Sequence, residues 1–268
     1  MHSPPLFTLA LSLTAALAAP AVHARPSAEL NSTVSGNYTV TQGATRSQLE
    51  ISESDALGAP VSATASKYGV GFDAHAQLDN TALSAFAATT IAGATGSASA
   101  QALTRLTDFI TFSGGSGMGT ASLTALLTGT LTGNQTGTAG YQLDIALYDV
   151  SDIGGSVSLS NPLWLVTDTR SSGGRQMLTV DDSFTSSFDF EYGKQYGIVA
   201  SFSVNAADGG VADFSNTTSF AMAAAPSVRL HSLAGVDYGI TAAVPEPASY
   251  AMLLAGLGLM GLIAHRRR

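Results

Sequence analysis

Apolar and polar side chains alternate along much of the chain, and this period of two limits the fold more than any other feature of the sequence. Successive side chains of a β-strand point to opposite faces, so alternation predicts strands with one buried face. Residues 119–132, 141–147 and 196–204 show the pattern most clearly. In the first of these, one face carries Leu123, Ala125, Leu127 and Leu131, and the other carries Thr120, Ser122, Thr124, Thr128, Thr130 and Thr132.

Turn-forming residues separate the expected strands. Pairs such as Gly133-Asn134, Gly154-Gly155 and Gly173-Gly174 can adopt the positive φ angles of tight turns at little steric cost. Many strands with a turn about every ten residues predict an all-β fold, an antiparallel β-sandwich or jelly-roll-like single domain. Weaker strand patterns occur at residues 98–112, 163–167, 176–180, 184–192, 219–222 and 238–242.

Several local predictions accompany this fold. Residues 80–90 carry apolar side chains at helical spacing, which predicts a short helix. Residues 25–43 are polar and predict a frayed or edge segment, whereas the Gly/Ala/Ser/Thr-rich residues 91–98 predict a loop. Trp164, which has apolar neighbours on both sides, is expected to anchor the core, and Asp213 is expected to fix a turn.

Charge and cysteine content exclude several classes of function. Eleven basic residues stand against 19 acidic ones, for a formal net charge of −8, and the only lysines are Lys67 and Lys194. Affinity for nucleic acid comes from neutralising phosphates with cations, so we expect no nucleic-acid partner. The absence of cysteine excludes disulfides, thiolate metal sites and cysteine nucleophiles.

The sequence contains no convincing catalytic constellation. Between the two ends of the chain only His75 and His231 remain, and neither has a second His or Glu at metal-ligand spacing. The carboxylates Asp189 and Glu191 lie two residues apart, which predicts a solvated strand face rather than the acid pair of a glycosidase. We therefore expect a protein that is not an enzyme.

Two groups of loop carboxylates could hold a structural calcium ion. Asp149 and Asp152 precede a glycine pair, and Asp181 and Asp182 follow an expected strand. Carboxylate oxygens are the ligands that Ca²⁺ prefers, although neither group follows the EF-hand pattern. Such an ion would stabilise the domain, and no other cofactor is expected.

The amino-terminal residues 1–24 have the form of a secretory signal. An apolar core at residues 6–19 is followed by small residues at the positions that signal peptidase inspects, with cleavage predicted after Ala24. Removal of this segment leaves residues 25–243 as the expected mature, extracellular, β-rich domain.

The carboxyl terminus combines three features. The uncharged residues 248–264, as a helix, would span roughly 26 Å, just sufficient for a bilayer. The basic tail, residues 265–268, includes Arg266, Arg267 and Arg268, which would hold that end in the cytoplasm. On the outer side, residues 244–247 are Val-Pro-Glu-Pro, and the two prolines favour an extended peptide beside the membrane.

Together these features resemble the PEP-CTERM sorting signal, over about the last 25 residues. The resemblance implies that Pro245, Glu246 and Pro247 are read by an exosortase, a membrane-embedded protease-transpeptidase that removes the helix. The protein would then be anchored in the inner membrane before processing, and afterwards lie at the cell surface or in the extracellular polysaccharide.

Two functions remain open for the mature domain. The first is a non-catalytic surface or matrix protein. The second is a binding module, for carbohydrate or, less favoured, for ice or a calcium-dependent ligand. A carbohydrate site would show exposed aromatic rings, and an ice-binding face would need threonine rows on neighbouring strands. Residues 141–149 and 195–204, taken as those neighbours, carry no such rows.

Overall fold

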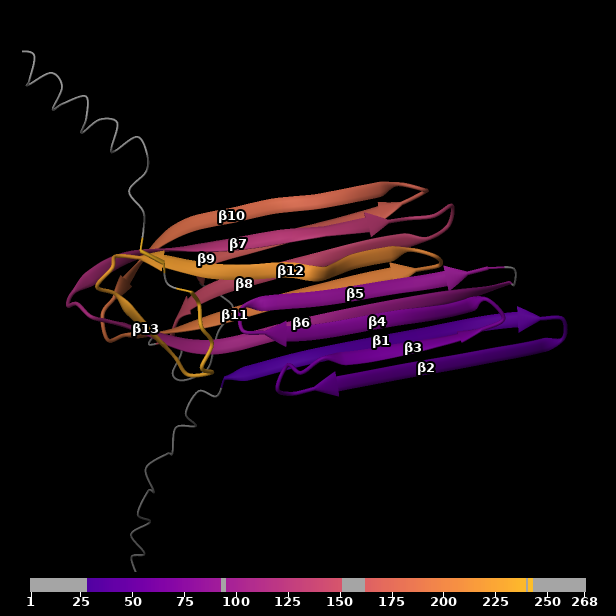
Figure 1. Cartoon of the computed structure of the whole chain (residues 1–268), viewed down its shortest axis with the longest axis horizontal. Helices are drawn as coiled ribbons and strands as arrows, with labels where there is room; N and C mark the ends of the chain where they lie inside the picture. The colour runs from indigo at the N-terminus through magenta and orange to yellow at the C-terminus, as the bar shows by residue number, and fades with distance from the viewer. Residues whose placement is uncertain (1–27, 93–94, 151–161, 240, 243–268) are drawn as a thin grey trace, which may run out of the picture.

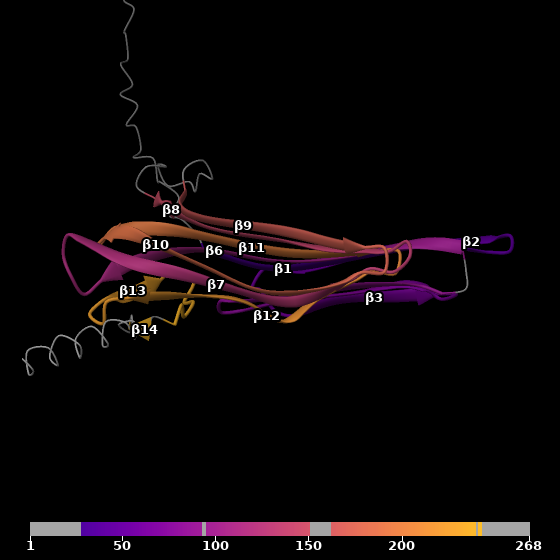
Figure 2. The ribbon, with the colours of Figure 1, turned by 90° about the horizontal axis from the view of Figure 1, so that it is seen from above.

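The protein forms two β-sheets packed face to face. Figure 1 looks down the shortest axis of the sandwich, and Figure 2, turned by 90°, shows it from its edge. The computed structural model describes residues 28–92, 95–150, 162–239 and 241–242. Sheet A has the strand order β2-β1-β6-β11-β8-β9, with β13 also paired to β6; sheet B has the order β10-β7-β12-β5-β4-β3, with β14 paired to β12. The predicted all-β antiparallel sandwich is confirmed.

The strands of sheet A are β1 (Glu29–Gln42), β2 (Thr45–Asp55), β6 (Thr95–Ser113), β8 (Thr138–Asp149), β9 (Pro162–Gly173), β11 (Gln195–Ala207) and β13 (Arg229–Ser232). Those of sheet B are β3 (Val61–Lys67), β4 (Val70–Asp79), β5 (Ala82–Ile91), β7 (Met118–Thr132), β10 (Met177–Glu191), β12 (Val211–Ala224) and β14 (Thr241–Ala242).

The central strands of both sheets bury one side-chain row between the sheets, and small residues leave room there for aromatic rings. In β1 the buried row includes Val34, Gly36 and Val40. A Cβ atom on Gly36 would fall inside the ring of Phe72, which reaches it from β4 in the opposite sheet. Further along, Phe112 stacks on Phe190 with ring centroids 4.0 Å apart. The core thus combines aromatic rings that pack against glycine with rings that stack on one another.

Polar contacts close the two edges of the sandwich. At one edge, Arg170 on β9 lies 2.7 Å from Asp182 on β10 in the other sheet. Arg170 also flanks Asp168, which accepts a hydrogen bond from the buried Tyr141. Burial, and then this hydrogen bond, raise the pKa of Tyr141, so its hydroxyl remains a donor at physiological pH. At the other edge the Lys67 ammonium donates to Ser47.

A buried carboxylate fastens the segment that follows β12. Asp108 on β6 is fully buried, and it accepts hydrogen bonds from its neighbour Phe109 N, from Ser232 Oγ at 2.6 Å, from Ala234 N at 2.9 Å and from Tyr238 Oη at 2.8 Å. A buried charge is tolerated when such donors surround it. Desolvation and the nearby Asp108 raise the pKa of Tyr238, which keeps this phenol a donor. We call these contacts the Asp108 clasp.

Three local predictions are wrong. Residues 82–91 form strand β5 between β4 and β12. Ala82, Leu83, Phe86 and Ala87 fall at helical spacing, but Leu83, Ala85 and Ala87 alternate along the same segment and are the residues that the strand buries. Residues 29–42 form β1 in the interior of sheet A, where threonines, two asparagines and Ser35 face outward and obscure the buried row. Residues 95–98 belong to β6 rather than to a loop.

Two other predictions concern single residues. Trp164 is 5% exposed, which confirms that it belongs to the core. Asp213 lies within β12 instead of in a turn, and it accepts hydrogen bonds from Ser215 N and Oγ beside a β-bulge. The bulge explains why turn chemistry occurs inside a strand.

The contact between Gly36 and Phe72 makes a first prediction. We expect Gly36→Ala to lower the free energy of unfolding by about 1–3 kcal/mol, because the added methyl group overpacks the core. Urea denaturation measures the change. Asn37→Ala, the adjacent exposed position, should change stability by less than about 0.5 kcal/mol. Equal effects of the two substitutions would refute the packing argument.

The Asp108 clasp makes a second prediction. Tyr238→Phe should cost about 1.5–3 kcal/mol, the range for a hydrogen bond to a charged group, because it removes one donor from the buried carboxylate. Tyr68→Phe, at an exposed ring, is the matched control and should be neutral. If Tyr238→Phe unfolded at the same urea concentration as the wild type, the clasp would contribute nothing to stability.

Candidate functional site

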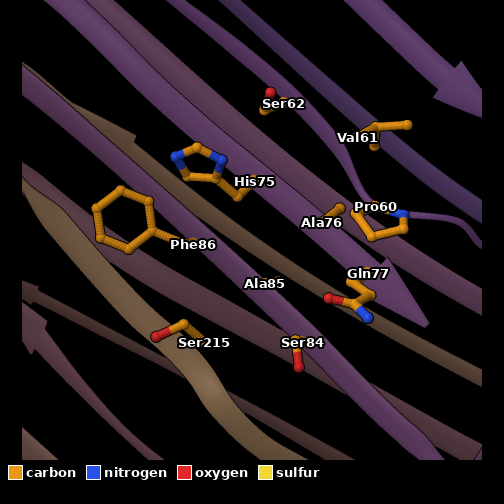
Figure 3. Close-up of a pocket in the computed structure, with 10 residues that line it drawn as sticks. All are labelled: Pro60, Val61, Ser62, His75, Ala76, Gln77, Ser84, Ala85, Phe86 and Ser215. Carbon is orange, nitrogen blue, oxygen red and sulfur yellow. The ribbon is translucent and has the colours of Figure 1, made fainter. Parts of the chain in front are cut away.

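A hollow of about 300 Å³ on the outer face of sheet B combines an aromatic ring with polar side chains (Figure 3). His75 on β4 and Phe86 on β5 lie next to each other at one side of it, with ring centroids 5.6 Å apart. The remaining lining residues are Pro60, Val61, Ser62, Ala76, Gln77, Ser84, Ala85 and Ser215.

Strand register places these side chains on the same face. His75 is the register partner of Phe86 across the β4–β5 pair, and Ser62 on β3 is the partner of His75 on its other side. In β4 the core receives Phe72, Ala74 and Ala76. The residues between them, among them His75, therefore point outward.

A carboxylate orients the histidine. His75 Nε2 lies 2.8 Å from Asp73 Oδ1, and the two side chains are 52% and 44% exposed. In a strand, residues two apart share a face, so Asp73 sits at the rim of the hollow. The pair fixes the imidazole beside Phe86.

The arrangement suits a hydroxyl-rich ligand better than an ion. The partly buried Phe86 ring offers an apolar surface, and the Ser62, Ser84 and Ser215 hydroxyls and the Gln77 amide can each donate and accept hydrogen bonds. Among the residues the structure describes, no group of three or more His, Cys, Asp or Glu side chains could hold a metal ion.

The threonine face of β7 has neighbours other than those expected from the sequence. β7 pairs with β10 and β12, whereas β8 and β11, the strands considered above, lie in sheet A. β10 does extend the hydroxyl row, and Thr124 and Thr185 hydrogen-bond at 2.9 Å. Leu126, which is 47% exposed, interrupts the row, and β12 contributes alanines at Ala221 and Ala223. The hydroxyl face is thus two strands wide.

The calcium candidates do not converge in the described part of the chain. Asp149 pairs with Lys194, and Asp182 pairs with Arg170. Asp181 points to the opposite, outer side of β10, where it lines a separate hollow of about 410 Å³ with Asp213, Thr128, Thr130 and Thr179, together with Gly129 and Val180. Asp152 lies outside the described residues. The structural calcium ion stays a prediction.

The remaining candidates also lie apart. His231 on β13 belongs to sheet A and contacts Ser113 Oγ at 3.1 Å, so the two histidines occupy different sheets. Asp189 accepts a hydrogen bond from Thr120, and Glu191 is exposed on the same outer face. These placements agree with the expectation of a solvated carboxylate face.

Comparison with known families identifies the carboxyl end. Residues 243–268 match the family described as the PEP-CTERM protein-sorting motif, one residue longer than the segment 244–268 inferred above. The chain carries a PEP-CTERM sorting motif. No curated protein and no solved structure gives a significant match to the chain.

The PEP-CTERM motif marks the chain as an exported protein that is targeted to an exosortase and anchored through its carboxyl-terminal region before processing. Pro245, Glu246, Pro247 and the three terminal arginines lie outside the described residues, as do Ala24 and the rest of the predicted signal peptide. The part of the chain that the structure describes contains no helix of membrane-spanning length and apolarity.

Sequence reasoning found the PEP-CTERM motif and missed the hollow. The motif depends on neighbouring residues, whereas the hollow joins β3, β4, β5 and β12 through strand pairing. One signal was available: between residues 72 and 78, Phe72, Ala74, Ala76 and Leu78 alternate with polar side chains. That alternation predicts a strand with His75 on its outer face.

Proposed function

We propose that this PEP-CTERM protein is a non-catalytic component of the cell surface or extracellular matrix, exported through its signal peptide and released by an exosortase. The sorting motif carries the proposal. The composition of both outer faces supports it: β1 and β11 in sheet A, and β7 and β10 in sheet B, expose mainly Ser, Thr, Asn, Asp and Glu side chains. Such faces remain hydrated inside a polysaccharide gel.

Existing contacts of the carboxylates support a structural role for them. Asp182 pairs with Arg170, Asp149 with Lys194, and Asp189 with Thr120. Each of these carboxylates is thus already engaged by a neighbouring side chain.

Carbohydrate binding is a second candidate, which the hollow around His75 and Phe86 specifically favours. The Phe86 ring is partly accessible beside the His75 imidazole and offers the aromatic surface that a sugar site requires, and Ser62, Ser84, Ser215 and Gln77 lie around it with hydrogen-bonding groups. The matrix role and the binding role are compatible, since a matrix protein that binds glycan would be retained by the polysaccharide.

The sorting proposal predicts the behaviour of Glu246→Ala. Removing the carboxylate from the Pro-Glu-Pro motif should leave the protein in the inner membrane with its tail intact. Cell fractionation and intact mass spectrometry of the recovered protein measure this. Glu191→Ala, at an exposed carboxylate of the sandwich, is the control and should be processed as the wild type. Normal release of the Glu246→Ala protein would count against sorting by this motif.

The binding proposal predicts loss of glycan affinity in hollow variants. On a glycan array, Phe86→Ala should weaken binding about 5- to 10-fold, the range expected when one aromatic contact is lost. His75→Ala should weaken it as well. Tyr68→Asn is the control: it removes another exposed ring from a turn position with φ of 51°, which asparagine tolerates.

Two results would contradict the binding proposal. Either the wild-type domain binds no glycan on the array, or Phe86→Ala and Tyr68→Asn reduce binding equally. A thermal-hysteresis assay on the same samples separates ice binding, which would depend on the Thr124 and Thr185 face instead.

A further inference from the structure

The chain remains attached to the sandwich almost to the sorting motif. After β12 it turns at Val228 N, which donates to Ala225 O, and crosses to sheet A as β13, paired with the end of β6. The Asp108 clasp then holds Ser232, Ala234 and Tyr238. Finally β14 returns to sheet B, where Thr241 and Ala242 pair with Ala223 and Ala224 of β12.

The direction of β14 shows where the chain leaves the sandwich. β14 runs parallel to β12, so at Ala242 the chain continues in the direction in which β12 ends. The end of β12 lies beside the start of β7, since Ala224 pairs with Ala121. The chain therefore exits at the end of the molecule where β7 begins, which is the end that carries β13 in Figures 1 and 2.

We define the β14 end as residues 114–117, 192–194 and 225–237, together with β14. Hydrogen bonds from Tyr192 N to Gly117 O and from Gly193 N to Phe112 O join its turns. Exposed side chains at or near it include Met118, at 67%, and Leu233, at 55%. At the opposite end of the long strands lies Met177, at 69%, whose register partner is Thr132 of β7.

The remaining tether is short compared with the sandwich. From Ala242 to Ala248, the first residue of the apolar run, are six residues, which reach at most about 20–22 Å when fully extended. By contrast the 15 residues of β7, at about 3.3 Å each, separate the two ends by roughly 46–50 Å. The tether cannot let the far end replace the β14 end at the membrane.

We propose that the anchored protein stands on its β14 end, with that end against the outer surface of the bilayer and the long strands directed away from it. The short tether keeps the β14 end nearest the membrane, and the acidic chain, with a formal net charge of −8, has no electrostatic attraction to an anionic bilayer that would lay the sandwich on its side. The inference rests on membrane anchoring through residues 243–268. The exosortase would then meet the Pro-Glu-Pro motif within about 18 Å of the last paired residue, Ala242.

The absence of cysteine allows a direct test. Met118→Cys and Met177→Cys place single thiols of nearly equal exposure at the two ends. The full-length chain, labelled with one donor dye, is reconstituted into phosphatidylethanolamine–phosphatidylglycerol vesicles that contain a headgroup-labelled acceptor lipid. We expect energy transfer to be several-fold stronger from position 118 than from position 177.

Two insertions provide matched controls. A Gly/Ser linker of about 12 residues after Ala242 should bring the two transfer values together, because the domain then tumbles on a flexible chain. The same linker within residues 133–137, the turn between β7 and β8, should leave the difference unchanged.

Three outcomes would overturn the proposal. Equal transfer from both positions without a linker would mean that the sandwich lies on its side, and stronger transfer from position 177 would mean the reverse orientation. Weak transfer from both positions would also overturn it, and would show in addition that residues 243–268 do not anchor the chain.

Discussion

The structure depends on the packing of aromatic rings against small residues in the core between the two sheets. Phe72 from sheet B occupies the space that Gly36 of sheet A leaves, and Phe214 lies over Gly129 of its neighbouring strand. Because the chain has no disulfides, stability must come from this packing and from the polar contacts at the edges and ends. The Asp108 clasp adds to this packing in the last segment, where Val228, Val236 and Tyr238 also join the core.

The sequence predicted the architecture because alternation is a local property, and it failed where small residues satisfy two patterns. The sequence predicts a helix over residues 80–90 because their alanines fit a period of 3.6 as well as a period of two, and only pairing with β4 and β12 decides for the strand. In β1, Ser32 and Gly36 occupy inward positions. The buried row was therefore too weak to recognise without the partner strand.

The candidate site shows the same division. The sorting motif could be read from the sequence because its three parts, residues 244–247, the apolar residues 248–264 and the basic tail 265–268, are adjacent in the chain. The hollow could not, because it needs the register that sets His75 beside Phe86 and a bulge that carries Ser215 on β12. The neighbours chosen for the threonine face were wrong for a related reason. The chain changes sheet after β7, so β7 and β8 follow one another in the sequence but are not paired.

The outer faces consist mostly of short side chains. Serine and threonine lose little rotational freedom when a surface contacts them, whereas lysine and arginine lose up to about 2 kcal/mol each. A broad ligand that touches many such hydroxyls would meet a surface that is already ordered, and each weak hydrogen bond would contribute nearly its full value. The scarcity of long cationic side chains thus leaves outer faces whose hydroxyl groups lose little freedom on contact.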